Sequence, residues 1–319
     1  MERIEKAREM EVYHTLEDLK AFPREKETHV TLGVFDGIHL GHQALLTRVK
    51  ESTMGTRAIP AVFTFRNHPL SVLAPVYAPP FLTTEDMRIE IFASLGIEMA
   101  VIVPFDHTLA DLSPEEFARE ILFKRLRARH VVCGYNFCFG RGGAGDMTLL
   151  CKLGQDMGFV VEQMKPVTIR NMIVSSTRIR EYLSQGMVEL AAEFLGRPYA
   201  LRGVVEKGAG RGKTLNYPTA NLVFPQDLLI PPTGVYAVRI LADGRVYNGM
   251  MNIGCNPTFP PERFSAEAHL FDFQGDLLDK KIEVQFIRRM RDEIRFETGS
   301  ELIDQLKSDE KTARKMLET

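Results

Sequence analysis

The pattern of apolar residues changes near residue 190, and this change constrains the fold more than any other feature of the sequence. Before it, apolar runs alternate with segments of helical periodicity. The expected strands are 29–35, 58–65, 98–105, 129–137 and 159–167, and the expected helices are 42–56, 83–96, 113–126 and 149–158. A repeated strand–helix alternation predicts an α/β fold with a doubly wound parallel sheet.

The second half is rich in strands. Two short segments of helical periodicity, 176–186 and 187–196, each end at a glycine. Six expected strands follow, at 199–208, 219–224, 234–243, 245–254, 266–273 and 281–290, and a helical pattern over 300–317 closes the chain. This order predicts a six-stranded antiparallel β-barrel with a terminal helix. We therefore expect two domains, residues 1–186 and residues 187–319.

Composition excludes several classes of function. The chain has 40 basic and 42 acidic residues, so bulk charge gives no support for a nucleic-acid partner. The acidic N-terminus and the absence of an apolar run of about 20 residues predict a cytoplasmic protein without a membrane contact. The four cysteines form no CxxC pair, and we expect buried, reduced thiols. His130, Cys133 and Cys138 lack the spacing of a zinc site.

Residues 33–42, GVFDGIHLGH, follow the first expected strand and combine three glycines with two histidines. In a doubly wound sheet this turn is the favoured position for a phosphate. Glycines let backbone amides approach an anion, and ring N–H groups can stabilise charge on phosphorus. Solvent-facing histidines on a plain turn are the alternative. SSTRIR (175–180) offers hydroxyls, helix N-terminal amides and cations, although spacing alone favours an ordinary helix cap.

The segment 206–222, EKGAGRGKTLNYPTANL, opens the second half with a glycine-rich, basic loop. It lacks the pattern of a P-loop, and a simple hairpin turn would explain its glycines. Thr219 and Asn221 lie two positions apart and therefore face the same side of a strand, where their oxygens could ligate Mg²⁺.

These motifs carry a family resemblance in the first half. HLGH resembles the signature of the nucleotidyltransferase superfamily, and GVFDGIHLGH as a whole is similar to the longer form found in bacterial FAD synthetases. Similar segments are SSTRIR, TFRNHPL (64–70) and CGYNFCFGRGGAGD (133–146). The resemblance implies His39 and His42 as catalytic residues, and nucleotide or phosphate contacts by Gly33, Asp36, Gly41, Asn67, Asn136, Ser176, Thr177 and Arg180. It also implies a contact by His68, with turn chemistry as the alternative for residues 67, 68 and 136. Ile173 replaces an arginine of many relatives.

The second half resembles riboflavin kinases through PTAN (218–221) and the segments GVYAV, NIGCNPTF, AEAHLFDFQGDLLDK and RDEIRFETGSEL. The resemblance implies Glu267 as general base, with an exposed salt bridge as the alternative. It further implies phosphate contacts by Gly208 and Lys213, metal ligation by Thr219 and Asn221, and flavin contacts by Arg291 and Phe296. Asn216 and Asp279 stand where relatives have glycine.

Together these resemblances imply a bifunctional riboflavin kinase and FMN adenylyltransferase, which makes FMN and then FAD from riboflavin and two ATP with Mg²⁺. The expected partners are the small molecules riboflavin, FMN and ATP, and the sequence carries no signal for an oligomeric state. Two alternatives remain: one of the two activities is lost, or the scaffold is a flavin-binding sensor without enzymatic activity.

Overall fold

The fold is described from a computed structural model that covers residues 10–208, 217–254 and 265–318. The chain divides into two compact units. The first comprises Met1–Phe81 and Glu85–Val174, and the second comprises Leu82–Thr84 and Ser175–Thr319. By this division, residues 175–186 group with the second unit. The boundary at residues 186 and 187 stays a prediction about the functional domains.

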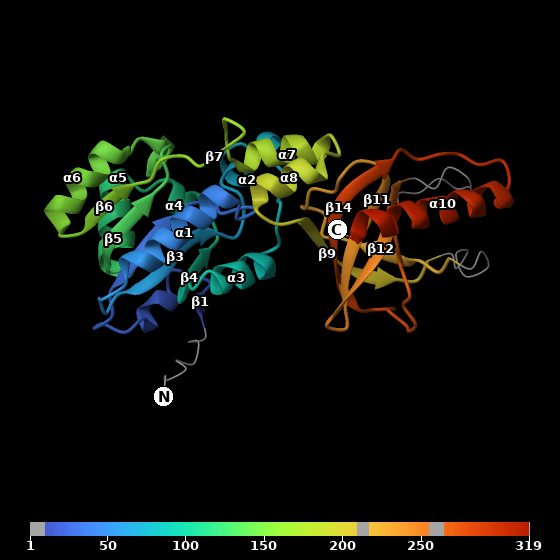
Figure 1. The fold of residues 1–319 in the computed structure, drawn as a ribbon. Helices are drawn as coiled ribbons and strands as arrows, with labels where there is room; N and C mark the ends of the chain where they lie inside the picture. The colour runs from blue at the N-terminus through green and yellow to red at the C-terminus, as the bar shows by residue number, and fades with distance from the viewer. Residues whose placement is uncertain (1–9, 209–216, 255–264, 319) are drawn as a thin grey trace. The chain divides into compact units, whose positions relative to one another are not determined.

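The first unit contains a six-stranded parallel sheet in the order β1-β4-β3-β2-β5-β6 (Figure 1). Its strands are β1 (Glu11–Tyr13), β2 (Thr28–Leu32), β3 (Ile59–Phe65), β4 (Met99–Val103), β5 (Ala128–Cys133) and β6 (Val160–Gln163). The five expected strands are present, and β1 is an additional edge strand. A small hairpin, β7 (Thr168–Ile169) and β8 (Met172–Ile173), follows β6.

Both faces of this sheet are covered, as a doubly wound fold requires. On one face, α1 (Leu40–Ser52) and α3 (Glu85–Ser94) pack Leu46 and Phe92 against Val62 and Ile102. On the other face, Val30 and Phe63 point toward η1 (Asp18–Ala21), η3 (Phe117–Arg125) and α6 (Met147–Met157). Alternate residues of each strand thus enter opposite cores, which is the period-two pattern of a buried strand.

The expected helix over 113–126 begins as predicted and then departs from α geometry. Ser113 caps α5 (Pro114–Glu116) with a complete capping box, and the chain continues as the π-helix η3. The remaining short helices of this unit are α2 (Leu70–Leu73), η2 (Pro75–Tyr77), α4 (His107–Ala110) and η4 (Arg141–Gly143).

The cysteines only partly match the expectation of buried thiols. Cys133 is buried and free, whereas Cys138 and Cys151 are exposed, so the expectation was wrong for these two. Cys138 lies in a surface loop after β5, and Cys151 lies on the solvent side of α6. Cys255 falls outside the described residues.

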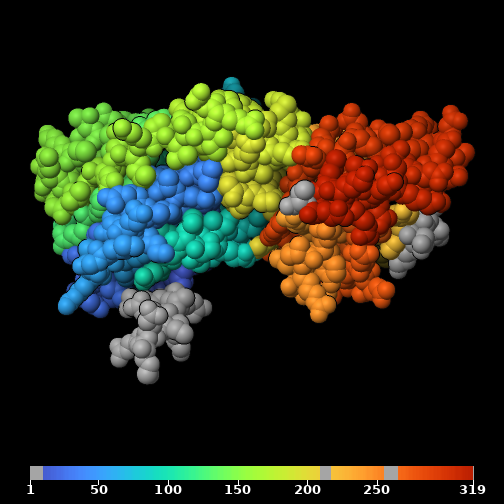
Figure 2. All heavy atoms as spheres, in the orientation of Figure 1, coloured from blue at the N-terminus to red at the C-terminus, as the bar shows by residue number. Residues whose placement is uncertain are grey.

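The second unit contains the predicted barrel, closed in the order β10-β13-β12-β11-β14-β9. Its antiparallel strands are β9 (Tyr199–Glu206), β10 (Ala220–Val223), β11 (Gly234–Ala242), β12 (Arg245–Gly254), β13 (Ser265–Leu270) and β14 (Lys281–Arg291). The unit begins with α7 (Ser176–Ser184) and α8 (Val188–Leu195) and ends with α10 (Gly299–Leu317), drawn in red in Figure 2. Ala313 and Leu317 of α10 pack on Ala237 and Met250 of the barrel.

Within the described part of the chain, no helix combines the length and the apolar character needed to cross a membrane.

Candidate active sites

The turn after β2 holds both candidate catalytic histidines. His39 is the N-cap of α1, and its Nδ1 accepts a hydrogen bond of 3.2 Å from the backbone N–H of His42. The two rings stack with 3.7 Å between centroids and 15° between planes. Because Nδ1 of His39 is an acceptor, a neutral His39 carries its proton on Nε2. The pair can therefore present ring N–H groups to one ligand.

The backbone of this turn is strained. Phe35 and Ile38, which are not glycines, have φ angles of 49° and 38°, and Gly37 has φ of 79°. Non-glycine residues in this region cost of order 1–3 kcal/mol each and concentrate at functional sites. A Cβ on Gly41 would lie 3.1 Å from Cε1 of His39, so glycine at this position gives the imidazole its room. The turn is thus shaped around its histidines.

Hydrogen bonds tie the turn to β3. The N–H of Gly33 donates to the Phe63 carbonyl at 3.2 Å, and Oγ1 of Thr64 donates to the Val34 carbonyl at 2.9 Å. Asp36 is 1% exposed, so its carboxylate lies inside the turn. This burial gives Asp36 a structural position, and a direct phosphate contact by Asp36 stays a prediction.

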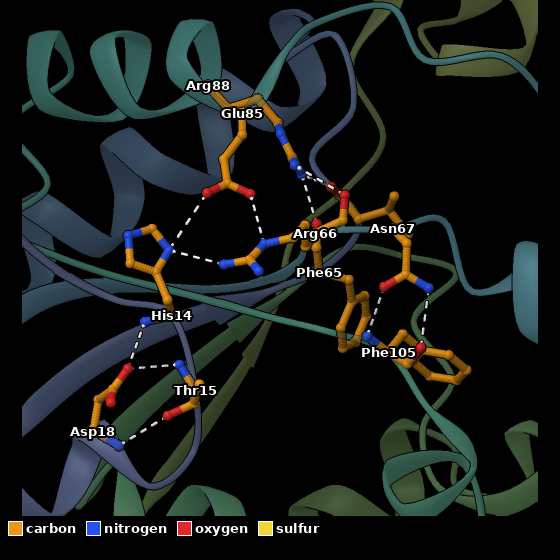
Figure 3. A network of polar contacts seen from close by, with 10 residues as sticks. His14, Thr15, Asp18, Phe65, Arg66, Asn67, Glu85, Arg88 and Phe105 are labelled. Carbon is orange, nitrogen blue, oxygen red and sulfur yellow. Dashed lines mark hydrogen bonds and ion pairs between the residues drawn. The ribbon is translucent and has the colours of Figure 1, made fainter. Parts of the chain in front are cut away.

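The segment after β3 lies at the same edge of the sheet and is held by its own side chains (Figure 3). Oδ1 of Asn67 accepts from the Phe105 N–H at 2.8 Å, and its Nδ2 donates to the Phe105 carbonyl at 3.0 Å. Nδ1 of His68 accepts from the Leu70 N–H at 3.1 Å. Asn67 therefore joins the loops after β3 and β4, and its nucleotide contact stays a prediction.

Sequence reasoning missed Arg88, which reaches both of these segments. Its guanidinium donates to the carbonyls of Phe65 and Arg66 (Figure 3). It also donates to the Val34 carbonyl. Arg88 lies within the expected helix 83–96, where an arginine is ordinarily assigned to the solvent side. Its side chain is instead 1% exposed. The local signal that could have found it is spacing, because Arg88 precedes the core residues Ile91, Phe92 and Leu95 by three, four and seven positions and so lies on the apolar face of the helix.

The remaining candidates for the nucleotide are on the surface or in the second unit. Asn136 is exposed in the turn after β5. Ser176, Thr177 and Arg180 lie in the first turns of α7, which Ser175 caps by accepting from the Arg178 N–H at 3.3 Å. The alternative explanation of this segment, a helix cap, is thus present in the structure, and nucleotide contacts by Ser176, Thr177 and Arg180 stay predictions.

The second candidate site lies on the barrel around Glu267. Oγ1 of Thr219 donates to Oε2 of Glu267 at 3.1 Å. Asn221 on β10 and Asn252 on β12 are the direct cross-strand neighbours of Glu267 on β13. Ala266 and Ala268 are buried, whereas Glu267 is half-buried on the opposite face. The strand register thus gathers a carboxylate, a hydroxyl and two amides, all of them oxygen-bearing groups.

The glycine-rich loop begins directly over this site. A Cβ on Gly208 would lie 2.0 Å from Nδ2 of Asn221, so only glycine permits this close approach. The Pro218 carbonyl accepts a hydrogen bond from His269 at 2.8 Å if Nδ1 carries the proton, which holds the PTAN segment against β13. Lys213 and Asn216 lie outside the described residues.

Sequence reasoning also assigned no role to Asn252 and Glu293. Nδ2 of Asn252 donates to Oε1 of Glu293 at 3.5 Å, and the Glu293 carboxylate fills the space that a side chain on Gly254 would need. Both residues belong to segments with a family resemblance. Their proximity depends on the path of the chain after β14, which no local pattern reveals.

Arg291 is a structural partner of the terminal helix. Its guanidinium binds both carboxylate oxygens of Asp309 on α10, with N–O distances of 2.6–3.1 Å. Asp309 also accepts from Gln305 at 2.8 Å. A cavity of about 500 Å³ opens beside Arg291, lined also by Gly186, Met187, Met290 and Asp292. Phe296 is half-buried in the segment between β14 and α10. Flavin contacts by these two residues stay predictions.

Asp279, which by the resemblance stands where relatives have glycine, has φ of 62°, a left-handed conformation that favours glycine. Aspartate tolerates this conformation better than most residues. The departure from glycine therefore leaves the turn before β14 in the glycine-like conformation, and its N–H donates to the Val205 carbonyl at 2.9 Å.

The donor set suits a metal held jointly with nucleotide phosphates. Thr219, Asn221 and Glu267 offer the oxygen ligands that Mg²⁺ prefers. Across the described ranges, no group of three His, Cys, Asp or Glu side chains forms a metal site of its own. A cation at this site would therefore be coordinated in part by the nucleotide phosphates or by water.

Family models match both halves of the chain. The model described as FAD synthetase matches residues 22–178, and the model described as riboflavin kinase matches residues 195–317.

Curated relatives match over most of their length. The chain is 38% identical over 290 residues to the bifunctional riboflavin kinase/FMN adenylyltransferase of Bacillus subtilis, covering 89% of this chain and 90% of that protein. It is 35% identical over 286 residues to the protein of that description from Escherichia coli K12, covering 89% and 91%. A solved structure described as a macrolide-efflux protein from Streptococcus pneumoniae is 31% identical, with a TM-score of 0.86 and coverage of 96% and 98%.

Proposed function

The chain belongs to the family of bifunctional riboflavin kinases/FMN adenylyltransferases, and we propose here which residues carry out each reaction. The protein phosphorylates riboflavin to FMN with ATP, and it then transfers an adenylyl group from a second ATP to FMN, giving FAD and pyrophosphate. The single observation that carries the assignment is that each family model coincides with one of the two clusters of polar residues.

Adenylyl transfer takes place at the turn of residues 33–42. The phosphate of FMN attacks the α-phosphorus of ATP, the bond to the β-phosphate oxygen breaks, and pyrophosphate leaves. This reaction needs no protein nucleophile, so positioning and charge stabilisation supply the rate. His39 and His42 donate to phosphate oxygens. Gly33 and Gly41 lie within the same turn, where the N–H of Gly33 is engaged by the Phe63 carbonyl and the lack of side chains leaves room for the phosphates. The ring stack at 3.7 Å supports a joint role of the two histidines.

Phosphorylation takes place at Glu267. The carboxylate accepts the proton of the riboflavin 5′-hydroxyl while that oxygen attacks the γ-phosphorus of ATP and ADP leaves. The hydrogen bond from Thr219 supports this role because it fixes one oxygen of the carboxylate, Oε2, and thereby orients the carboxylate group. Gly208 and Lys213 contact the phosphates, and Arg291 and Phe296 contact the flavin.

Both families depend on ATP with a divalent cation, and we infer that the cation is Mg²⁺. Thr219 and Asn221 hold it by their side-chain oxygens, next to the phosphates. When bound, Mg²⁺ neutralises charge that develops on the transferred phosphoryl group. Of the predictions from the sequence, the cytoplasmic location and the absence of nucleic-acid and membrane partners are retained as proposals.

Two variants test the assignment by separating the reactions. His42→Ala should lose most FAD formation from FMN and ATP, while it still converts riboflavin to FMN. Glu267→Gln should bind riboflavin but lose phosphorylation by about 100-fold or more, because a general base contributes roughly 10²–10⁴-fold. Chromatography of riboflavin, FMN and FAD after incubation with ATP and Mg²⁺ measures both. Unchanged FAD synthesis by His42→Ala, or a near-normal phosphorylation rate for Glu267→Gln, would refute the respective role.

A further inference from the structure

Arg88 is a buried cation that bridges the two polar segments of the first site. Nη1 donates to the carbonyl of Phe65 at 2.8 Å and to that of Val34 at 3.4 Å, and Nη2 donates to the carbonyl of Arg66 at 3.4 Å. Val34 belongs to the histidine turn, whereas Phe65 ends β3 and Arg66 begins the segment with Asn67 and His68. One guanidinium therefore sets the distance between both segments.

Within the described residues, the hydrogen-bond acceptors of Arg88 are carbonyl oxygens and not carboxylates. Of the carboxylates that the structure describes, none lies within ion-pair distance of its guanidinium, and its buried Nε finds no hydrogen-bond acceptor there. The face of Phe81 lies 5.6 Å from Cζ. Burial lowers the pKa of Arg88, and the more distant charges of Asp36 and Glu85 oppose this shift.

The acidic side chain of the same helix whose charge acts on Arg88, Glu85, is already engaged elsewhere (Figure 3). Glu85 accepts from Nε of Arg66 at 3.1 Å and lies 3.4 Å from Nδ1 of His14. Asp36 is buried in the turn and acts on Arg88 only over a longer distance. Carbonyl oxygens satisfy hydrogen bonds of Arg88 but do not neutralise its charge, and a buried charge without a counter-ion is unfavourable. A protein keeps such a cation where an anion completes the site, and the turn next to Arg88 is assigned to ATP phosphates.

We propose that Arg88 is a positioning residue for adenylyl transfer, which fixes the 33–42 turn to the segment after β3 and favours the anionic triphosphate on that turn. This inference rests on the proposed assignment of the turn to ATP. The planar guanidinium supplies the geometry, because its N–H groups point to fixed directions, and the positive charge supplies the attraction.

Two substitutions separate these contributions. Arg88→Met removes both, and it should lower kcat/KM for ATP in FAD formation by about 100-fold, the loss that a misplacement of about 1 Å can cause. Arg88→Lys restores the charge without the planar fork. It should return KM for ATP to within about threefold of the wild type, while kcat stays about tenfold low.

The same chain provides its own control. Riboflavin phosphorylation by the second unit should stay within about twofold in both variants. Arg129→Met is a matched control, because Arg129 is a half-exposed cation of the first unit that pairs with Glu27 at the opposite end of the sheet. It should leave both activities unchanged. If Arg88→Met does not stay folded, the split between kcat and KM in Arg88→Lys decides the question.

The result that overturns the inference is a lowered melting temperature of the Arg88 variants with kcat and KM for ATP within twofold of the wild type. Equal losses of kcat and of ATP affinity in Arg88→Lys and Arg88→Met would also contradict it, since the charge would then play no part. His42→Ala in the same assays separates this failure from a failure of the proposed site. An inactive His42→Ala beside fully active Arg88 variants refutes the inference alone, whereas an active His42→Ala refutes the assignment of the turn.

Discussion

The two candidate sites of this chain are built in different ways. The first is local, because ten consecutive residues supply both histidines, the glycines and the strained backbone around them. The second depends on strand register, since Thr219, Glu267 and Asn252 come from three separate segments and meet only when β10, β12 and β13 pair. A local site can be recognised from its contiguous sequence, whereas a register-dependent site needs the fold.

The two sites also use arginine differently. Arg291 is held by a bidentate ion pair with Asp309, and the pair joins β14 to α10. Arg88 is more deeply buried and has carbonyl oxygens as its acceptors. Substitution of Arg291 should therefore act mainly on stability, and substitution of Arg88 mainly on catalysis.

The largest effect is expected for Arg291→Met. The change leaves Asp309, which is 4% exposed, without its cation, and breaking a buried pair in this way costs about 3–5 kcal/mol. Urea unfolding of the protein measures this loss in the free energy of unfolding of the second unit. Arg288→Met on the same strand is the matched control, because Arg288 forms a half-exposed pair with Glu189, which contributes below about 1 kcal/mol. A small stability loss with a raised KM for riboflavin would instead make Arg291 chiefly a flavin ligand.

Gly208→Ala should disable the kinase site alone. The added methyl group must displace the amide of Asn221, a proposed metal ligand, and we expect about a 100-fold loss of riboflavin phosphorylation. FAD formation from supplied FMN should not change. Steady-state rates of both reactions measure this effect, and a kinase rate within twofold of the wild type would show that Asn221 does not need its present position.

Thr219→Val should lower phosphorylation by about tenfold or more, because it removes a hydrogen bond to an ionised acceptor worth roughly 1.5–3 kcal/mol. Thr219→Ser is the control, since it retains the hydroxyl. The Mg²⁺ concentration at half-maximal rate should rise only in the valine variant. Equal magnesium dependence of both variants would contradict ligation by this hydroxyl.

Gly41→Ala should produce a milder defect in the first site. The added methyl group would lie 3.1 Å from the His39 ring, a distance that requires a shift of a few tenths of an ångström. We expect about a tenfold loss of FAD formation, less than for a misplacement of a full ångström. Kinase activity in the same preparation is the control. A wild-type rate would show that the turn adapts more easily than its strained φ angles indicate.

The smallest effect concerns pH and the first unit. The ring centroids of His29 and His130 lie 5.4 Å apart. Burial lowers the pKa of both histidines below the usual value of about 6.5. The folded unit thus binds fewer protons than the unfolded chain. Its stability is complete above about pH 6.5 and declines as the pH falls through the lowered pKa values. Melting curves at pH 7.5 and 5.5 should show this decline, and it should be smaller in His29→Gln. If the melting temperature falls equally between pH 7.5 and 5.5 in the wild type and in His29→Gln, this histidine pair is not the cause of the decline.

Much of the fold follows from the sequence because it is encoded in periodicity. The alternation in residues 29–167 gave five of the six parallel strands, and each of the six barrel strands was expected within a few residues of its observed bounds. The edge strand β1 was missed because Glu11–Tyr13 is short and becomes a strand only by pairing with β4. The π-helix was missed because its period differs from the helical period that the apolar residues suggested.

The site is predictable where its residues are contiguous. His39, His42 and Gly41 stand in one motif, and their contacts follow from local geometry. Glu293 was missed because a charged residue in a loop carries no local sign of its partner. Arg88 was missed because an arginine is ordinarily assigned to the solvent, although its spacing to Phe92 places it on the apolar face of the helix. Only the packing of α3 on the sheet and the path after β14 bring them to the sites.

The central claim is that two independent sites act in sequence on one flavin, and mixing two variants tests it most directly. His42→Ala supplied with riboflavin and ATP should accumulate FMN, and Glu267→Gln should leave riboflavin unchanged. An equimolar mixture of the two should form FAD, because FMN released by the first variant reaches the intact turn of the second. Failure of the mixture, while Glu267→Gln still adenylylates added FMN and His42→Ala still releases FMN, would contradict two independent sites.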